Sequence, residues 1–177
     1  DWRCRPLKST RPAYRLAMLS LLTAVALIIF VIEAGIPPLT TIPGIKMGLS
    51  NIITLVTMVL FGRREALLVL LSRIFLGSLF AGQMMTLLYS LSGGLLCFVV
   101  CAGILPFLPV KRLWLMSMIG AVFHNIGQIA MAIFITSTPE LLWYLPVLLV
   151  SGLISGYFTG WAAQFVLFRL KSGPKSS

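Results

Sequence analysis

The sequence predicts an all-α membrane protein, a single bundle of six transmembrane helices. Hydrophobic residues make up 59% of the 177 residues and charged residues only 10%, against roughly 25% charged in ordinary soluble domains. Several apolar runs also approach the roughly 17 to 25 residues that cross a bilayer. The net charge of +10 does not indicate a nucleic-acid partner, because the basic residues are scattered in short segments between the apolar runs.

Six apolar runs can be followed along the chain, of which the second is short and the last long. The first contains Ala24-Val25-Ala26, which resembles a signal-peptide cleavage site. Hydrophobicity continues through Ile32, however, so we expect an uncleaved first helix. The expected helices cover residues 16–35, 49–61, 66–82, 85–105, 113–136 and 141–168.

The basic residues predict the orientation. If both termini face the cytoplasm, twelve of the fourteen Lys and Arg residues fall in inside segments, and only Lys46 and Arg73 remain. An odd number of spans would place either the basic head or the basic tail outside. We therefore expect a basic cytoplasmic head over residues 1–15, one six-helix transmembrane domain over 16–169 and a short disordered cytoplasmic tail over 170–177.

The segment 35–48, after the first run, is too apolar for an ordinary loop and too rich in Pro and Gly for a helix. Irregular backbone near a bilayer is tolerated where protein or a water-filled cavity satisfies its polar groups. We expect an outer cap folded over the bundle, with a plain extracellular loop as the alternative. Glu33 lies near the outer end of the first run and Lys46 near the outer start of the second, either as an ion pair that anchors the cap or as part of a ligand mouth.

In the last run, Gly152, Gly156 and Gly160 recur every four residues and line one helix face, which lets a neighbouring backbone approach closely. The sequence leaves open whether that neighbour belongs to this chain or to another subunit. Within the chain, the small residues that could face these glycines are Ser78 and Gly82 in the third run, or Ala17, Ser20 and Ala24 in the first.

A few polar residues lie at membrane depth. A fixed charge such as Arg73 is expensive there unless it faces protein, water or an anion. His124 and Gln128 share one helical face with Asn125 beside them, and Asn51 stands at the entrance of the short second run. We predict that these five residues line a substrate-binding cavity, with Arg73 as its anion-facing element. The alternative is that each is a packing residue with its own separate partner.

Catalysis is poorly supported by the sequence. The only acidic residues are Asp1, Glu33, Glu65 and Glu140, which are too few for the carboxylate clusters that hold magnesium against a diphosphate. A Gly-rich phosphate loop of the Walker type is missing too. Cys97 and Cys101 lie at helical spacing and are expected to be small packing residues. We expect no catalytic residue, metal or cofactor.

Several short segments are distinctive in combination: IPGIKMGLSNIITL at 42–55, RIFLGSL at 73–79, SGG at 92–94, GAVFHNIGQ at 120–128, YLP at 144–146 and SG at 151–152. Taken together they resemble the bacterial membrane family labelled heptaprenyl diphosphate synthase component I, over residues 16–168. That family is also grouped with the Gx transporters, a superfamily that includes the substrate-binding S components of energy-coupling factor (ECF) transporters.

The resemblance implies an S-component-like bundle in the bacterial inner membrane, with a binding cavity near the outer face and separate ATPase and coupling membrane subunits. The small residues Ala17, Ser20 and Ala24 would then contact the coupling subunit. From this we predict the substrate-binding subunit of a small-molecule transporter, whose ligand the sequence does not name. The family label implies instead a non-catalytic accessory subunit beside a prenyl synthase, in isoprenoid-quinone metabolism. Relatives also suggest a membrane partner in quinone- or flavin-linked electron transfer.

Overall fold

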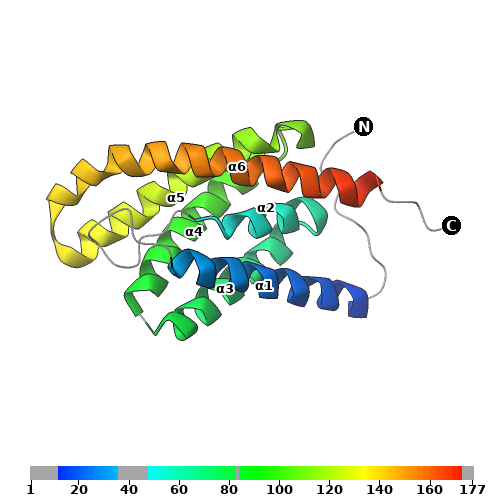
Figure 1. Ribbon diagram of the computed structural model, residues 1–177, viewed down its shortest axis with the longest axis horizontal. Helices are drawn as coiled ribbons and strands as arrows, with labels where there is room; N and C mark the ends of the chain where they lie inside the picture. Colours follow the sequence, from blue (N-terminus) through cyan, green and yellow to red (C-terminus); the bar gives the residue numbers. More distant parts are fainter. Residues whose placement is uncertain (1–11, 36–47, 83, 173–177) are drawn as a thin grey trace.

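The computed structural model describes residues 12–35, 48–82 and 84–172, and all regular structure in them is helical (Figure 1). Six α-helices occupy the six predicted runs, so the all-α prediction is confirmed. Two 3-10 helices, η1 (Val110–Arg112) and η2 (Pro139–Tyr144), precede α5 and α6. The α-helices are α1 (Pro12–Ala34), α2 (Asn51–Leu60), α3 (Arg63–Ala81), α4 (Met84–Ile104), α5 (Leu113–Thr136) and α6 (Leu145–Ser172).

Four helical segments are long and apolar enough to cross a membrane: Pro12–Glu33, Met84–Ile104, Leu113–Thr136 and Pro139–Arg169. The chain is therefore a multi-pass membrane protein. The other two helices are different in kind, because α2 has only 10 residues and α3 includes the charged residues Arg63, Arg64, Glu65 and Arg73. That α2 and α3 also cross the bilayer stays a prediction.

The helix ends follow from local residues. Gly62, with φ of 109°, turns the chain between α2 and α3, and Gly82, with φ of 63°, ends α3 in the left-handed conformation. The last predicted helix is divided, because η2 ends at Tyr144 and α6 begins at Leu145. Pro146 explains this division, since it has no N–H to donate to the carbonyl of Leu142 and is tolerated only in the first turn of a helix.

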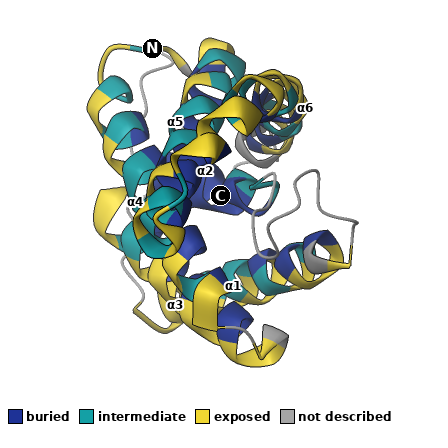
Figure 2. Ribbon diagram, turned by 90° about the vertical axis from the view of Figure 1, so that its left-hand side faces the viewer, coloured by how far each residue is buried: buried dark blue, intermediate teal, exposed yellow. Residues whose placement is uncertain are grey.

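Helix α2 lies at the centre of the bundle, where Figure 2 shows its ribbon almost entirely in the colour of buried residues. It touches α1, α3, α4 and α6. Helix α5 packs along both α4 and α6, while α1 packs on α3 and α2. The largest core cluster joins α2 residues such as Met58 to Met116 of α5 and Leu167 of α6. The outward faces carry large exposed apolar side chains such as Phe75, Phe158 and Trp161, as lipid-facing surfaces do.

The glycine face of α6 packs against α5 of the same chain. A Cβ at Gly156 would lie 2.9 Å from the Cα of Met118, and a Cβ at Gly160 would lie 2.5 Å from the Cα of Trp114. The hydroxyls of Ser117 and Thr159 meet across this contact at 3.0 Å. The two partners expected from the sequence are therefore wrong: neither the Ser78 and Gly82 face of α3 nor the small face of α1 covers these glycines.

The small face of α1 is open. Ala17, Ser20 and Ala24 are all exposed, so they are available to a partner, although that role stays a prediction. The guanidinium of Arg15 pairs with the carboxylate of Glu65 and ties the start of α1 to the start of α3. Helix α1 begins at Pro12, inside the segment expected to be the basic head, and α6 continues to Ser172, past the expected start of the tail.

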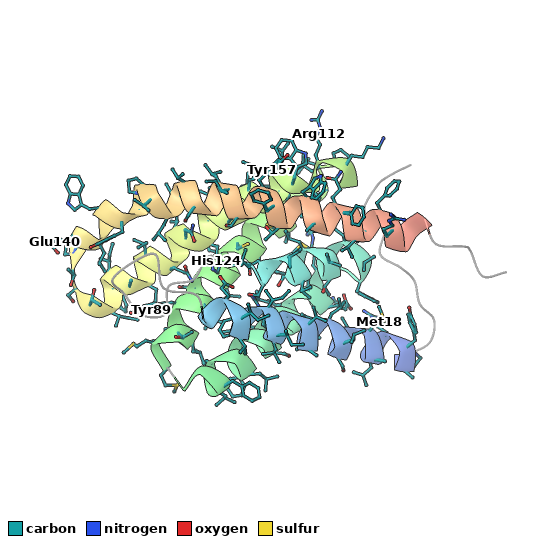
Figure 3. The ribbon with its side chains drawn as sticks, viewed as in Figure 1. Met18, Tyr89, Arg112, His124, Glu140 and Tyr157 are labelled. Carbon is teal, nitrogen blue, oxygen red and sulfur yellow. The ribbon has the colours of Figure 1, made fainter. Side chains whose placement is uncertain are left out.

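The start of α1, the turn from α2 to α3, the connection from α4 to α5 and the end of α6 all lie toward one end of the bundle (Figure 1). Exposed basic residues occur in each of these segments. Figure 3 labels one of them, Arg112, away from the opposite end that carries Glu140. The exposed basic residues of the described chain are thus collected at the end where α1 begins and α6 ends. The basic residues concerned are Arg15, Arg63, Arg64, Lys111, Arg112 and Arg169.

Candidate functional site

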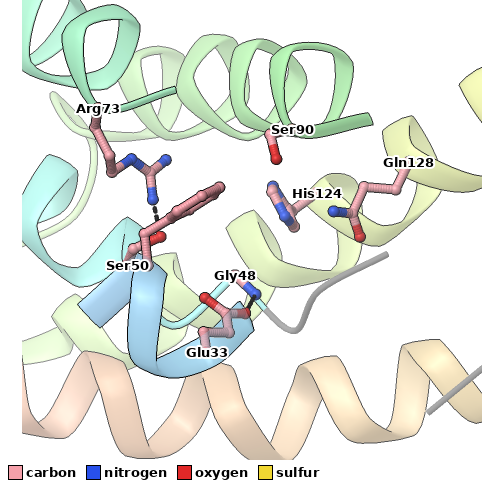
Figure 4. A pocket seen from close by; sticks show the side chains of 8 residues that line it. Glu33, Gly48, Ser50, Arg73, Ser90, His124 and Gln128 are labelled. Atoms are coloured by element: carbon pink, nitrogen blue, oxygen red, sulfur yellow. Dashed lines mark hydrogen bonds between the residues drawn. The ribbon is translucent and has the colours of Figure 1, made fainter. Parts of the chain in front are cut away.

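A polar pocket lies inside the bundle, toward the end opposite the basic residues. Its free volume is about 10 Å³, room for about one water molecule. Figure 4 shows the labelled side chains pointing toward one shared space from α1, the turn before α2, α3, α4 and α5. The lining residues are Phe30, Glu33, Gly48, Ser50, Arg73, Ser90, His124 and Gln128.

Arg73 enters the pocket from the middle of α3 and is buried, with 3% of its surface exposed. Its two terminal nitrogens donate to the chain at the start of α2: Nη1 to the hydroxyl of Ser50, and Nη2 to Oδ1 of Asn51 at 2.9 Å. Its Nε has no hydrogen-bond partner among the described residues. The guanidinium therefore holds the first residues of α2 while one donor stays unused.

Asn51 links Arg73 to His124. Because Oδ1 of Asn51 accepts from the guanidinium, the other amide atom is the NH₂ donor, and it lies 3.2 Å from Nδ1 of His124. When Nδ1 accepts this bond, the proton of the neutral imidazole lies on Nε2. The chain Arg73–Asn51–His124 thus fixes the direction of both the amide and the ring.

Gly48 separates the imidazole from Glu33. Its N–H donates to Oε1 of Glu33 at 2.5 Å, and its φ of 78° is a left-handed conformation that favours glycine. A Cβ at this position would lie 2.8 Å from Cδ2 of His124. The backbone can therefore pass between the carboxylate and the ring only because position 48 has no side chain.

Gln128 is fully buried, and neither its amide nitrogen nor its amide oxygen has a hydrogen-bond partner among the described residues. Gly93 of α4 makes room for it, since a Cβ there would stand 2.8 Å from Cγ of Gln128. A buried polar group left without a partner costs about 1 to 3 kcal/mol. Gln128 therefore destabilises the fold unless another group forms hydrogen bonds with its amide.

Asn125 lies outside the pocket. Its amide nitrogen donates to the carbonyl oxygen of Leu148 in α6 at 2.5 Å, and its side chain packs where a Cβ on Gly152 would stand. Of the five residues predicted to line the cavity, the structure thus brings Arg73, His124 and Gln128 to the pocket. Asn51 joins them through hydrogen bonds, and Asn125 instead connects α5 to α6.

Four lining residues were missed by the sequence analysis as members of a site: Phe30, Gly48, Ser50 and Ser90. Ser90 could have been identified from the sequence, because it is a polar residue three positions before Gly93 in an apolar run. Glu33 lines the pocket, whereas Lys46 and residues 36–47 of the expected cap lie outside the described residues. The expected pairing of Glu33 with Lys46 therefore stays a prediction.

The described residues hold no group of three or more His, Cys, Asp or Glu side chains that could bind a metal ion. Cys97 and Cys101 are buried in the main core cluster, with their Sγ atoms 4.0 Å apart. They pack against Gly120 of α5, where a Cβ would lie 2.7 Å from Sγ of Cys101. Their position is that of small core residues at the contact between α4 and α5.

A family model described as heptaprenyl diphosphate synthase component I matches residues 22–166, which is most of the chain. The chain belongs to this family. Neither a curated protein nor a solved structure was found to match. The name heptaprenyl diphosphate synthase component I describes one part of a synthase, and so implies a partner component. The match includes every residue that lines the pocket.

Proposed function

We propose that this member of the family is the substrate-binding membrane subunit of a Gx-type, ECF-like transporter that works with separate energising subunits. The observation that carries the proposal is the pocket itself: polar side chains from five segments converge inside an apolar bundle. Polar residues at membrane depth are costly and typically mark the path or site of a ligand. Gln128 and Nε of Arg73 are buried and have no hydrogen-bond partner among the described residues, so they are the groups available to that ligand.

In this mechanism the ligand enters from the outside and the subunit then reorients, driven by its partners. Six spans with the basic end in the cytoplasm would place the pocket toward the outer face, because Glu33 and Ser50 lie at the ends of α1 and α2 that are away from the termini. The expected cap, between Gly35 and Gly48, would then close over the pocket. The exposed small face of α1 offers a surface to the coupling subunit.

Catalysis by this chain is not part of the proposal. Glu33 lies at the pocket, Glu65 pairs with Arg15 at the basic end, and Glu140 lies in η2 at the other end. These three carboxylates are too dispersed to hold the metal ions that a diphosphate substrate needs. Any role in prenyl diphosphate synthesis would therefore be that of an accessory subunit.

The family match favours a second candidate, because the family is named as a component of a synthase. In that case the chain would be a non-catalytic membrane subunit bound to the catalytic component, or a partner in quinone- or flavin-linked electron transfer. Purification from the native membrane separates the candidates. Recovery of an ATPase pair with a coupling subunit supports transport, whereas stable recovery of a prenyl synthase or a flavoprotein supports the second candidate.

Replacement of Arg73 tests the site. Arg73→Ala is expected to insert and fold but to lose the small molecule that the wild-type protein retains, as measured by mass spectrometry of extracts from the purified proteins. Arg64→Ala is the matched control, since it removes an exposed arginine from the same helix. Equal retention by Arg73→Ala and the wild type would remove Arg73 from the binding site.

A further inference from the structure

The charges of the described residues that line the pocket balance. The ionisable ones among them are Glu33, Arg73 and His124. Glu33 and Arg73 carry opposite charges, and His124 adds no charge when its Nδ1 accepts the hydrogen bond from Asn51. A ligand with a net charge would be left without a counter-charge in this low-dielectric space, which is costly. The balance favours a ligand without net charge.

The donors of Arg73 are already engaged. Nη1 and Nη2 both serve the start of α2, so the paired donors that would grip a carboxylate or phosphate are occupied by Ser50 and Asn51. An anion would have to displace these bonds and release the first turn of α2. Arg73 thus acts mainly as a positioning residue, and the anion-facing role expected from the sequence does not fit its hydrogen bonds.

Gln128 supplies the recognition element. It presents an amide donor and an amide acceptor side by side, both buried and both without a partner among the described residues. The complementary partner is a group that also offers one donor and one acceptor side by side, as glutamine recognises the edge of adenine. A carboxamide or a lactam has this edge and carries no charge.

The size of the pocket and its aromatic wall favour a small, planar group in the ligand. The free volume of about 10 Å³ is about that of one water molecule, so only a compact polar group reaches Gln128. Phe30 forms an aromatic wall of the pocket, and its ring lies against Gly77, where a Cβ would come within 2.6 Å of it. An aromatic side chain thus borders the space that a planar ligand body would occupy.

We propose that the pocket binds a neutral, planar molecule through a carboxamide or lactam group that pairs with the amide of Gln128. This inference rests on the proposed function and narrows its substrate class. The ring or the remainder of the ligand lies on the Phe30 side. Ser90 and the imidazole of His124 line the same pocket, beside the pairing edge.

Three probes of similar shape test the charge and the edge separately: benzamide, benzoate and N,N-dimethylbenzamide. Binding to the full chain, purified in detergent, is measured by saturation-transfer NMR and by the shift in melting temperature. Benzamide is expected to bind at least about tenfold more tightly than either analogue, because benzoate brings an unbalanced charge and the dimethylated amide has no donor. This comparison needs only the wild-type protein.

Variants then locate the contact. Gln128→Met keeps the length of the side chain and is expected to remove the preference for benzamide over N,N-dimethylbenzamide. Gln164→Met is the matched control, because Gln164 also has a buried amide oxygen without a partner among the described residues but lies on α6, outside the pocket. Circular dichroism of both variants checks that the helices are retained.

Several results would overturn the inference: no detectable benzamide binding, equal binding of the three probes, or a preference that survives in Gln128→Met. Benzoate binding that is tightest and is lost in Arg73→Ala would also overturn it, while leaving the proposed transport function intact. Conversely, a clear preference for benzamide in a protein that recovers a synthase instead of an ATPase pair would keep the ligand class and remove the transport role.

Discussion

Gly93 of α4 lies directly against His124 of α5, where a Cβ at position 93 would stand 2.7 Å from the carbonyl oxygen of His124. The two helices are also in backbone contact one turn further on, since a Cβ on Gly127 would come within 2.9 Å of the Cα of Gly93. The hydroxyl of Ser92 donates to the carbonyl of Gly127 at 3.0 Å across the same contact. Because Gly93 has no side chain, α5 can approach α4 closely enough to place its pocket residues.

Gly93→Ala is expected to lower the melting temperature, because the added methyl would force apart two backbones and cost about 1 to 3 kcal/mol. Gly103→Ala is the control on the same helix, since a Cβ there meets nothing within 4 Å. It is expected to be neutral or to stabilise α4 by up to about 1 kcal/mol. Thermal unfolding in detergent measures both, and equal effects of the two variants would contradict the close contact.

Gly48→Ala is expected to disturb His124 without loss of helix, since the methyl would press on the imidazole. Gly82→Ala has the same left-handed strain, about 1 to 2 kcal/mol, but its Cβ would meet no atom within 4 Å. Gly48→Ala should therefore lose more stability than Gly82→Ala, and only Gly48→Ala should move the ring signals of His124 in NMR spectra. Unchanged His124 signals in Gly48→Ala would show that the glycine does not lie on the ring.

Replacements of Asn125 and Gln128 are expected to have opposite effects on stability. Asn125→Ala breaks the bond to the Leu148 carbonyl and should cost about 0.6 to 2 kcal/mol. Gln128→Met removes two buried polar atoms that have no partner in the described part of the chain, and should leave stability unchanged or raise it. Thermal unfolding of both variants gives the comparison. A loss of stability in Gln128→Met as large as that in Asn125→Ala would mean that its amide is satisfied within the bundle.

The orientation can be read from two single cysteines in a chain whose native cysteines are replaced by alanine. Glu140→Cys lies in η2 and Lys111→Cys in η1, on exposed positions at opposite ends of α5. A membrane-impermeant maleimide is expected to label Glu140→Cys in intact cells and Lys111→Cys only after permeabilisation, because basic segments stay in the cytoplasm. The reverse pattern would place both termini outside.

The helices could be located from the sequence because lipid compatibility constrains every residue of an apolar run. Arg73, His124 and Gln128 could be assigned to the interior for the same reason, since charged and polar groups avoid lipid. Asn125 shows the limit of that reasoning. It follows His124 by one residue, which is about 100° around the helix axis, and this rotation is enough to point it at α6 instead of the pocket.

The partner of the glycine face could not be predicted, because Gly152, Gly156 and Gly160 permit a close approach without selecting the helix that makes it. Backbone contacts of this kind depend on the relative placement of whole helices. The roles of Gly93 and Gly48 could not be predicted for the same reason, because they depend on which atoms from elsewhere in the chain fill the space beside each glycine. Ser50 also had no periodic signal, because it lies in a turn before α2.

The short central helix α2 has a consequence for how the protein matures in the membrane. Ten residues span about 15 Å, half the roughly 30 Å of the hydrocarbon layer, and nine of them are buried by neighbouring helices. Such a segment cannot be held by lipid alone, so it reaches its position only as the surrounding helices close around it. A chain in which that late step fails would present Asn51 and Arg73 to lipid, a state that cellular quality control would degrade.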